Sequence, residues 1–214
     1  MLKLLRRNVI DYIRAHIVAY FFMILIFVIG IVIGAMAVKT LPDEQKSELI
    51  GYLRVFFQGL SEHPEGITDT HTLLINVLVN NAKIIAIMWL LGFTIVGIPF
   101  VLFIVCLRGF VIGFTVGFLV NEYIMKGLLF AIASVLPHNF LAVPAILATG
   151  VSATTFSLML VRQKNKGKTN LFYSSIAYSI FCLTMLVIML GAALVEVYVS
   201  PVFMKTVALI ILKQ

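Results

Sequence analysis

Long runs of apolar residues dominate the chain and are separated by short polar segments. A helix that crosses a bilayer needs about 20 apolar residues, so runs of this length predict membrane-spanning helices. We expect about five transmembrane helices, at residues 17–38, 84–105, 110–123, 127–161 and 171–199. The predicted fold class is an all-α polytopic membrane protein, with residues 1–214 forming a single membrane domain.

The first span follows a basic segment, which resembles the start of a secretory signal peptide. Ala35-Met36-Ala37 would also suit a cleavage site. The apolar core of a signal peptide is usually about 7–15 residues long, and the run at 17–38 is longer. We therefore expect an uncleaved membrane anchor.

Prolines divide two of the predicted spans. Pro99 predicts a bend near Ile95 in the second span, because proline removes a backbone hydrogen bond. The fourth span, 127–161, would be about 50 Å long at 1.5 Å per residue, which is more than a bilayer needs. It contains the two proline sites Pro137-His138-Asn139 and Pro144. We expect a membrane elbow there, a non-helical break in the fourth span that its own side chains hold.

Residues 39–83 form the longest polar segment and contain more acidic than basic residues. Asp43 predicts a helix start, and apolar residues then recur with helical spacing from Leu49 to Leu60. The segment thus contains an amphipathic helix, whose apolar face must be covered by lipid or by protein. The residues that we single out for docking to a surface or a partner are Glu48, Arg54, Phe56 and Phe57.

The distribution of basic residues predicts the orientation of the spans. Residues 1–16 and the loop 162–170 are rich in Lys and Arg, so both should be cytoplasmic. The loop 39–83 and the C-terminus are then extracytoplasmic. The net charge of +7 does not indicate nucleic-acid binding, because the basic residues lie beside apolar spans and form no stripe with exposed aromatic residues.

Glycines at a spacing of four residues predict a helix-packing face. Gly109, Gly113 and Gly117 form one smooth stripe, which lets another backbone approach closely within lipid. Gly30 and Gly34 repeat the pattern in the first span. The partner of the stripe is either another helix of this chain or a second copy in a homo-oligomer, and the sequence leaves both open.

Few ionisable residues occur inside the spans. We expect Arg108 to extend to the membrane interface, and Glu122 and Glu196 to be solvated near the outer ends of their helices. His138 has no evident carboxylate partner at its depth, which favours a structural elbow over a proton or ligand site.

Motifs of catalysis and of cofactor binding are absent from the sequence. We find no GxSxG, HExxH, Walker A or dinucleotide-binding pattern, and all three aspartates lie outside the predicted spans. The four histidines are scattered without metal-ligand spacing. We expect no catalytic residue, no metal site and no cofactor.

Several stretches of the chain resemble the stage II sporulation protein M family. They are Met88-Trp89-Leu90-Leu91-Gly92-Phe93, Gly97-Ile98-Pro99, the glycine-rich run 107–121, Leu136-Pro137-His138-Asn139 with Pro144, and Phe156-Ser157-Leu158. Members of the family often have glycine and glutamate where this chain has Asn139 and Ala142.

The resemblance implies a role in endospore engulfment at the septal membrane of the mother cell. It further implies a non-catalytic scaffold, which recruits and anchors the peptidoglycan-degrading stage II sporulation proteins D and P. The alternative is a transporter or channel subunit. A broken fourth helix would suit that alternative, since discontinuous helices often line substrate sites, whereas the shortage of ionisable groups in the membrane argues against it.

Overall fold

The computed structural model describes Arg14 and residues 16–62, 70–163 and 171–202; the side chains of residues 54–62, of Thr70 and of residues 162–163 are not described. Almost all of these residues are helical and none of them lies in a strand, which confirms the predicted fold class. The elements are α2 (Ile17–Ala37), the 3₁₀ turn η1 (Val38–Thr40), α3 (Asp43–Glu62), α4 (Thr70–Gly92), α5 (Gly97–Gln163), α6 (Leu171–Leu194) and the π-helical turn η2 (Val195–Val199).

The helix α5 folds back on itself at Ile124. The backbone there has φ 47° and ψ −119°, a conformation that β-branched residues rarely adopt, and it separates a first arm (97–123) from a second arm (125–163). The predicted boundary between the third and fourth spans, at residues 123–127, is therefore confirmed. Leu119, Phe130 and Ala131 form a small buried cluster at this reversal.

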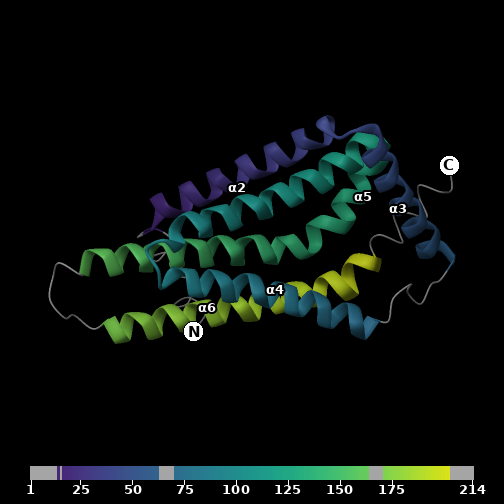
Figure 1. Ribbon diagram of the computed structural model, residues 1–214. Coiled ribbons are helices and arrows are strands. Elements are labelled where there is room, and N and C mark those ends of the chain that lie inside the picture. Colours follow the sequence, from purple (N-terminus) through teal and green to yellow (C-terminus); the bar gives the residue numbers. More distant parts are fainter. Residues whose placement is uncertain (1–13, 15, 63–69, 164–170, 203–214) are drawn as a thin grey trace.

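Four described helical segments are long and apolar enough to cross a membrane, and one of them contains both arms of α5. With the reversal at Ile124 the chain passes along the bundle five times, as the apolar runs predict. Figure 1 shows α2, the two arms of α5, α4 and α6 lying side by side, with the α2–α5 contact the most extensive. Core residues from all four helices, including Met23, Met88, Ile146 and Met189, are buried between them.

The predicted limits of the second and third spans are wrong. The chain reverses at residues 93–96, between α4 and α5, and does not bend within one span. Residues 84–92 end α4, whereas 97–105 and 110–123 belong to the same arm of α5. The polar segment 39–83 accordingly contains α3 and the first half of α4. The error arose because the reversal contains no charged residue and Lys83 gave the appearance of a boundary.

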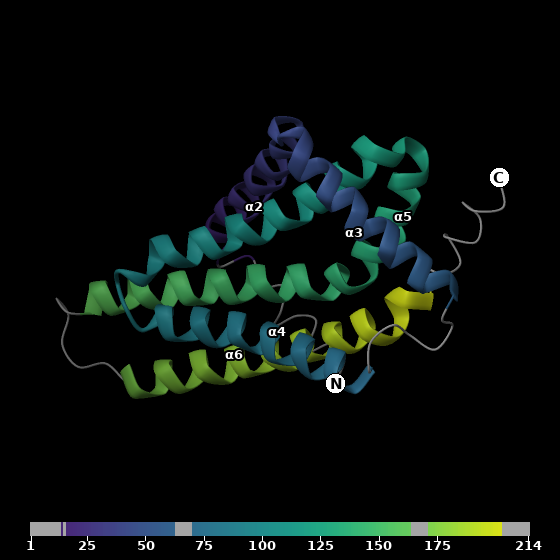
Figure 2. The same ribbon diagram turned by 45° about the vertical axis from the view of Figure 1, so that its right-hand side comes forward.

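The predicted break at Pro137-His138-Asn139 is also wrong. The second arm is helical through both Pro137 and Pro144, and Figure 2 shows it bending before it runs along the bundle. Asn139 Nδ2 donates a hydrogen bond of 2.8 Å to the carbonyl oxygen of Val135, one turn earlier. Buried helices tolerate proline where such side chains and neighbouring helices compensate for the lost backbone bond.

Side chains from distant segments hold the reversal at 93–96. At the end of α4 the backbone hydrogen bonds change from a spacing of four residues to a spacing of three. The Phe93 amide donates to the Leu90 carbonyl oxygen, so the Trp89 carbonyl loses its usual partner. Tyr178 of α6 donates its hydroxyl to that carbonyl at 3.0 Å, and Ser157 of the second arm donates to the Thr94 carbonyl at 2.8 Å. These bonds allow a short turn, in which Thr94 is the one polar residue, to reverse the chain without a longer polar loop.

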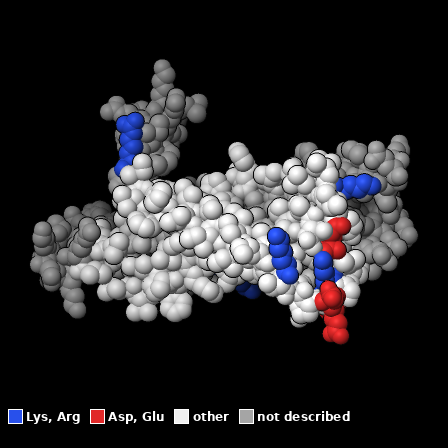
Figure 3. Space-filling model, turned by 90° about the horizontal axis from the view of Figure 1, so that it is seen from above, with Lys and Arg blue, Asp and Glu red and all other residues white. Residues whose placement is uncertain are grey.

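The amphipathic helix α3 lies across one end of the bundle, next to the reversal of α5 (Figure 2). Asp43 and Glu44 occupy its first turn, where acidic side chains favour the positive end of a helix. Leu53 packs against the buried cluster of Leu119, Phe130 and Ala131. Figure 3 shows most of the coloured charged side chains on this face gathered toward one end of the molecule, beside a broad uncharged region.

Candidate functional site

Two glycine stripes face each other where α2 runs beside the first arm of α5. A β-carbon built at Gly109 or Gly113 would overlap the carbonyl oxygens of Phe27 or Ile31 of α2. One built at Gly30 would overlap the carbonyl oxygen of Cys106 in the opposite helix.

The same arrangement continues one turn further along both helices. A β-carbon at Gly34 would overlap the carbonyl oxygen of Phe110, and one at Gly117 would lie 3.0 Å from the α-carbon of Ala35. Each helix thus supplies the smooth surface that the other needs, and the partner of the stripe is α2 of the same chain.

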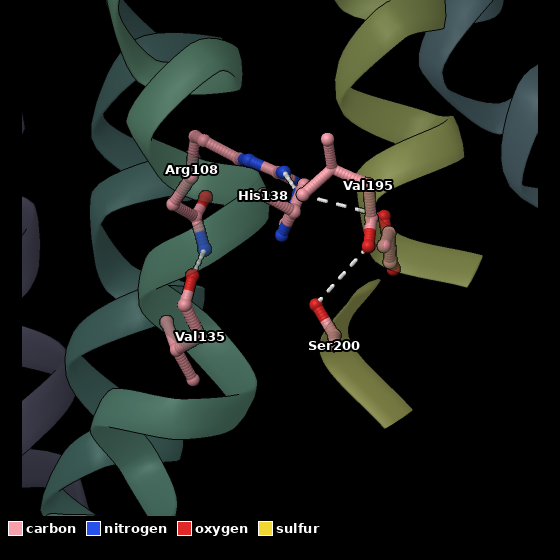
Figure 4. A network of polar contacts seen from close by, with 7 residues as sticks. Arg108, Val135, His138, Val195 and Ser200 are labelled. Atoms are coloured by element: carbon pink, nitrogen blue, oxygen red, sulfur yellow. Dashed lines mark hydrogen bonds and ion pairs between the residues drawn. The ribbon is translucent and has the colours of Figure 1, made fainter. Parts of the chain in front are cut away.

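A cluster of three ionisable side chains connects both arms of α5 with the end of α6 (Figure 4). Arg108 Nη2 lies 2.9 Å from His138 Nε2, and Glu196 Oε2 lies 3.5 Å from the same nitrogen. The His138 residue is 9% exposed. Because Arg108 lies near the middle of the first arm, this cluster lies at membrane depth.

Local backbone structure positions the Glu196 carboxylate. Glu196 belongs to η2, where α6 widens into a π-helical turn over Val195–Val199. The hydroxyl of Ser200, which is buried, lies 3.5 Å from the Val195 carbonyl oxygen and bridges this turn (Figure 4). Single π-helical turns within α-helices are frequent at functional sites, because they redirect side chains.

The expectations for these charged residues require correction. Arg108 does not extend to an interface but turns inward to His138, and Glu196 supplies the carboxylate partner that the histidine was expected to lack. Charges at membrane depth pair with one another, since lipid cannot solvate them. Glu122, which lies outside this cluster, pairs with Lys46 of α3: Lys46 Nζ and Glu122 Oε1 are 2.8 Å apart.

Two buried polar atoms beside the cluster have no hydrogen-bond partner among the described atoms, Arg108 Nε and Asn139 Oδ1. In the same residues, Arg108 Nη2 contacts His138 and Asn139 Nδ2 donates to the Val135 carbonyl oxygen. The elbow residues Pro137, His138, Asn139 and Pro144 therefore lie on a continuous helix, where His138 joins a charge network and Asn139 bonds its own backbone.

The predicted docking residues divide into one that is described and three that are not. Glu48 is exposed on α3 and accepts a hydrogen bond of 3.3 Å from the Tyr52 hydroxyl. The side chains of Arg54, Phe56 and Phe57 lie outside the described part of the chain. Between α3 and the α5 reversal lies a groove of about 460 Å³, lined by Leu49, Tyr52, Leu53, Phe114, Thr115, Phe118, Leu119, Phe130 and Ser134.

The site contains no group of three or more His, Cys, Asp or Glu side chains, within the described ranges, that could hold a metal ion. Cys106 and Cys182 are free thiols.

Comparison with known proteins assigns the family. A family model described as stage II sporulation protein M matches residues 23–201, from α2 to just beyond η2. The chain belongs to the stage II sporulation protein M family. Neither the curated proteins nor the solved structures yield a match.

Membership in the stage II sporulation protein M family implies a role in sporulation. The long apolar helices agree with a membrane protein of that family. Among the stretches that carried the resemblance, 88–99 forms the end of α4, the reversal and the start of α5, and 107–121 forms the α2-facing part of the first arm. These stretches therefore include both the reversal and the glycine interface.

Proposed function

We propose that the protein is a non-catalytic membrane scaffold of endospore engulfment, which recruits and anchors peptidoglycan-degrading proteins at the septal membrane of the mother cell. The observation that carries the proposal is the position of α3, a 20-residue helix placed across one end of a bundle of apolar helices. By the resemblance, its partners are stage II sporulation proteins D and P. The basic segments 1–16 and 162–170 support an extracytoplasmic position for this end.

Two contacts on one face of α3 fix its position relative to the membrane helices. The Lys46–Glu122 ion pair joins it to the first arm of α5, with side chains 31% and 16% exposed. Leu53 joins it to the cluster at the reversal. A helix held in this way presents its exposed polar side chains, such as Gln45 and Glu48, to a partner without the entropy loss of ordering a free segment.

A pull-down from sporulating cells tests the proposal. Glu48→Lys combined with Arg54→Glu inverts charges on α3 and should remove the hydrolases from the captured complex while the membrane level stays normal. The matched control, Lys46→Glu with Glu122→Lys, reverses the ion pair but retains its attraction, and should keep the hydrolases.

A second pair of variants examines the apolar side of the same helix. Phe56→Ser with Phe57→Ser removes large side chains that cost about 1.5–3 kcal/mol each when exposed to water. If this variant and the charge inversion both retain the hydrolases and engulfment proceeds, α3 is not the recruiting element and the proposal fails in this form.

The cluster of Arg108, His138 and Glu196 favours a second candidate, a transporter or channel subunit. Ionisable residues at membrane depth often mark ion or proton pathways. Purified protein in liposomes with a trapped pH-sensitive dye separates the two candidates under an imposed proton gradient. Proton flux that Glu196→Gln abolishes would establish transport, whereas dye signals equal to those of empty liposomes support the scaffold.

A further inference from the structure

One nitrogen atom in the membrane cluster faces two partners with opposite requirements. The guanidinium of Arg108 carries only donors, so its 2.9 Å contact requires an unprotonated His138 Nε2 that accepts the hydrogen bond. The ionised carboxylate of Glu196 carries only acceptors, so its 3.5 Å contact becomes a hydrogen bond only when Nε2 carries a proton. Both bonds cannot exist at the same time.

We propose that His138 Nε2 is a proton-binding site, and that its occupancy decides whether the second arm of α5 is bonded to Arg108 of the first arm or to Glu196 at the end of α6. This inference goes beyond the scaffold function and does not depend on it.

Proton uptake changes the bonding in a defined way. A hydronium ion of the solvent transfers its proton to the Nε2 lone pair that had accepted the hydrogen bond of Arg108, which forms an N–H bond and leaves water. The imidazolium then repels the guanidinium and donates to the Glu196 carboxylate. No other reactant is required, and the net charge of the three side chains rises from zero to one.

The π-helical turn η2 gives this exchange a structural consequence. Glu196 lies within the turn, which Ser200 bridges through the carbonyl oxygen of Val195. A wide turn has weaker backbone hydrogen bonds than an α-helix, so it can adjust when its carboxylate moves toward His138. Proton binding at His138 therefore replaces a bond within α5 by a bond between α5 and α6.

Other charged groups on the packed helices do not face His138. No charged residue occurs in α2 between Ile17 and Ala37. On α4, His71 and Lys83 are exposed. Near the reversal of α5, Lys126 is exposed, and Glu122 is paired with Lys46.

The tyrosine and the thiol of α6 interact elsewhere as well. Tyr178 donates to the carbonyl oxygens of Met88 and Trp89, and Cys182 belongs to the same buried core. Within the described residues, Arg108 and Glu196 are thus the charged groups in contact with the imidazole.

Nitrogen NMR of the imidazole measures the site directly. The full-length protein would carry ¹⁵N-labelled histidine in lipid nanodiscs, with His16, His63 and His71 replaced by Gln so that the signal arises from His138. At alkaline pH, Nε2 should be the unprotonated nitrogen. Acidification should produce a spectrum in which both nitrogens carry protons.

Two single variants should move the midpoint of this titration in opposite directions. Glu196→Gln removes the anion beside Nε2 and should lower the midpoint by about one pH unit or more, since an opposite charge at this distance has such an effect. Arg108→Gln removes the repelling cation and should raise it. Glu122→Gln, a glutamate outside the cluster, is the matched control and should leave the midpoint unchanged.

Two results would overturn the inference. One is a protonated Nε2 at alkaline pH, which would mean that Arg108 does not hold that nitrogen as an acceptor. The other is a Glu196→Gln midpoint equal to that of Glu122→Gln. Because the isolated protein suffices, failure here leaves the pull-down test of the scaffold unaffected.

Discussion

Substituting Gly113 by Ala should force α2 and the first arm of α5 apart. The added β-carbon would lie 2.7 Å from both the α-carbon and the carbonyl carbon of Ile31, and would overlap the carbonyl oxygen. These are backbone atoms within a helix, so no side-chain rotation can relieve the contact. The two helices must separate along the stripe, and the packing that replaces hydrophobic association in lipid is lost.

The contacts predict a graded series of free energies of unfolding. Overpacking of this kind costs about 1–3 kcal/mol, so Gly113→Ala should be destabilised by at least that amount. Gly117→Ala meets its nearest atom, the α-carbon of Ala35, at 3.0 Å and should lose less. A β-carbon built at Gly191 of α6 would meet no atom within 4 Å beyond the neighbouring backbone of its own helix, so Gly191→Ala should gain about 0.4–1 kcal/mol from the reduced freedom of the unfolded chain.

Thermal unfolding in detergent, followed by circular dichroism, measures the series. For a chain of this size, 1 kcal/mol corresponds to a change in Tm of about 2–4 °C. From the highest to the lowest Tm, the expected order is Gly191→Ala, wild type, Gly117→Ala and Gly113→Ala. The double variant of Gly34→Ala with Gly113→Ala should lose less than the sum of the two single losses, because the first substitution already opens the interface. If the Tm of Gly113→Ala equals that of Gly191→Ala, the stripe does not hold α2 and the reasoning is refuted.

Two further predictions concern the reversal at residues 93–96. Tyr178→Phe leaves the Met88 and Trp89 carbonyls without their donor and should lower the free energy of unfolding by about 1–3 kcal/mol, measured by the same melting assay. With Cys106 and Cys182 removed, a membrane-impermeant thiol reagent should label Glu44→Cys but not Ile95→Cys in intact cells; the opposite pattern would contradict the orientation.

The matched control for Tyr178→Phe is Thr184→Ala. The Thr184 hydroxyl donates to the Ile180 carbonyl oxygen of its own helix and is exposed, so its loss should leave the Tm nearly unchanged. Equal losses for the two variants would mean that Tyr178 does not hold the reversal.

The glycine stripe and the amphipathic segment could be recognised because their signals are local. Spacing by four residues places glycines on one helical face, whatever that face contacts. The recurrence of apolar residues at the helical period defines α3 without reference to its neighbours. For the same reason, the identity of the partner was not readable. The contact between Gly113 and Ile31 joins residues far apart in the chain, and it follows only from the parallel packing of α2 on the first arm.

Helix boundaries inside the apolar region were the main failure. Hydropathy registers a loop through its charged and strongly polar residues, but the turn at 93–96 has Thr94 as its one polar residue. Ser157 of the second arm donates to the Thr94 carbonyl oxygen, and Tyr178 donates to the Trp89 carbonyl oxygen just before the turn. Proline predicted a break at Pro137 because its local effect is unfavourable in an isolated helix. Packing against neighbouring helices outweighed that effect, and the break occurs at Ile124 instead.

The sequence by itself predicted about five apolar helical passes, because the cost of leaving a backbone polar group unbonded in lipid permits long apolar segments only as helices. It also determined the orientation that we expect from the basic segments. Only the tertiary structure decided that Arg108, His138 and Glu196 meet. Each looked solitary in its own segment, and a charge in lipid has no low-energy state alone, so the fold had to bring its partners from other helices.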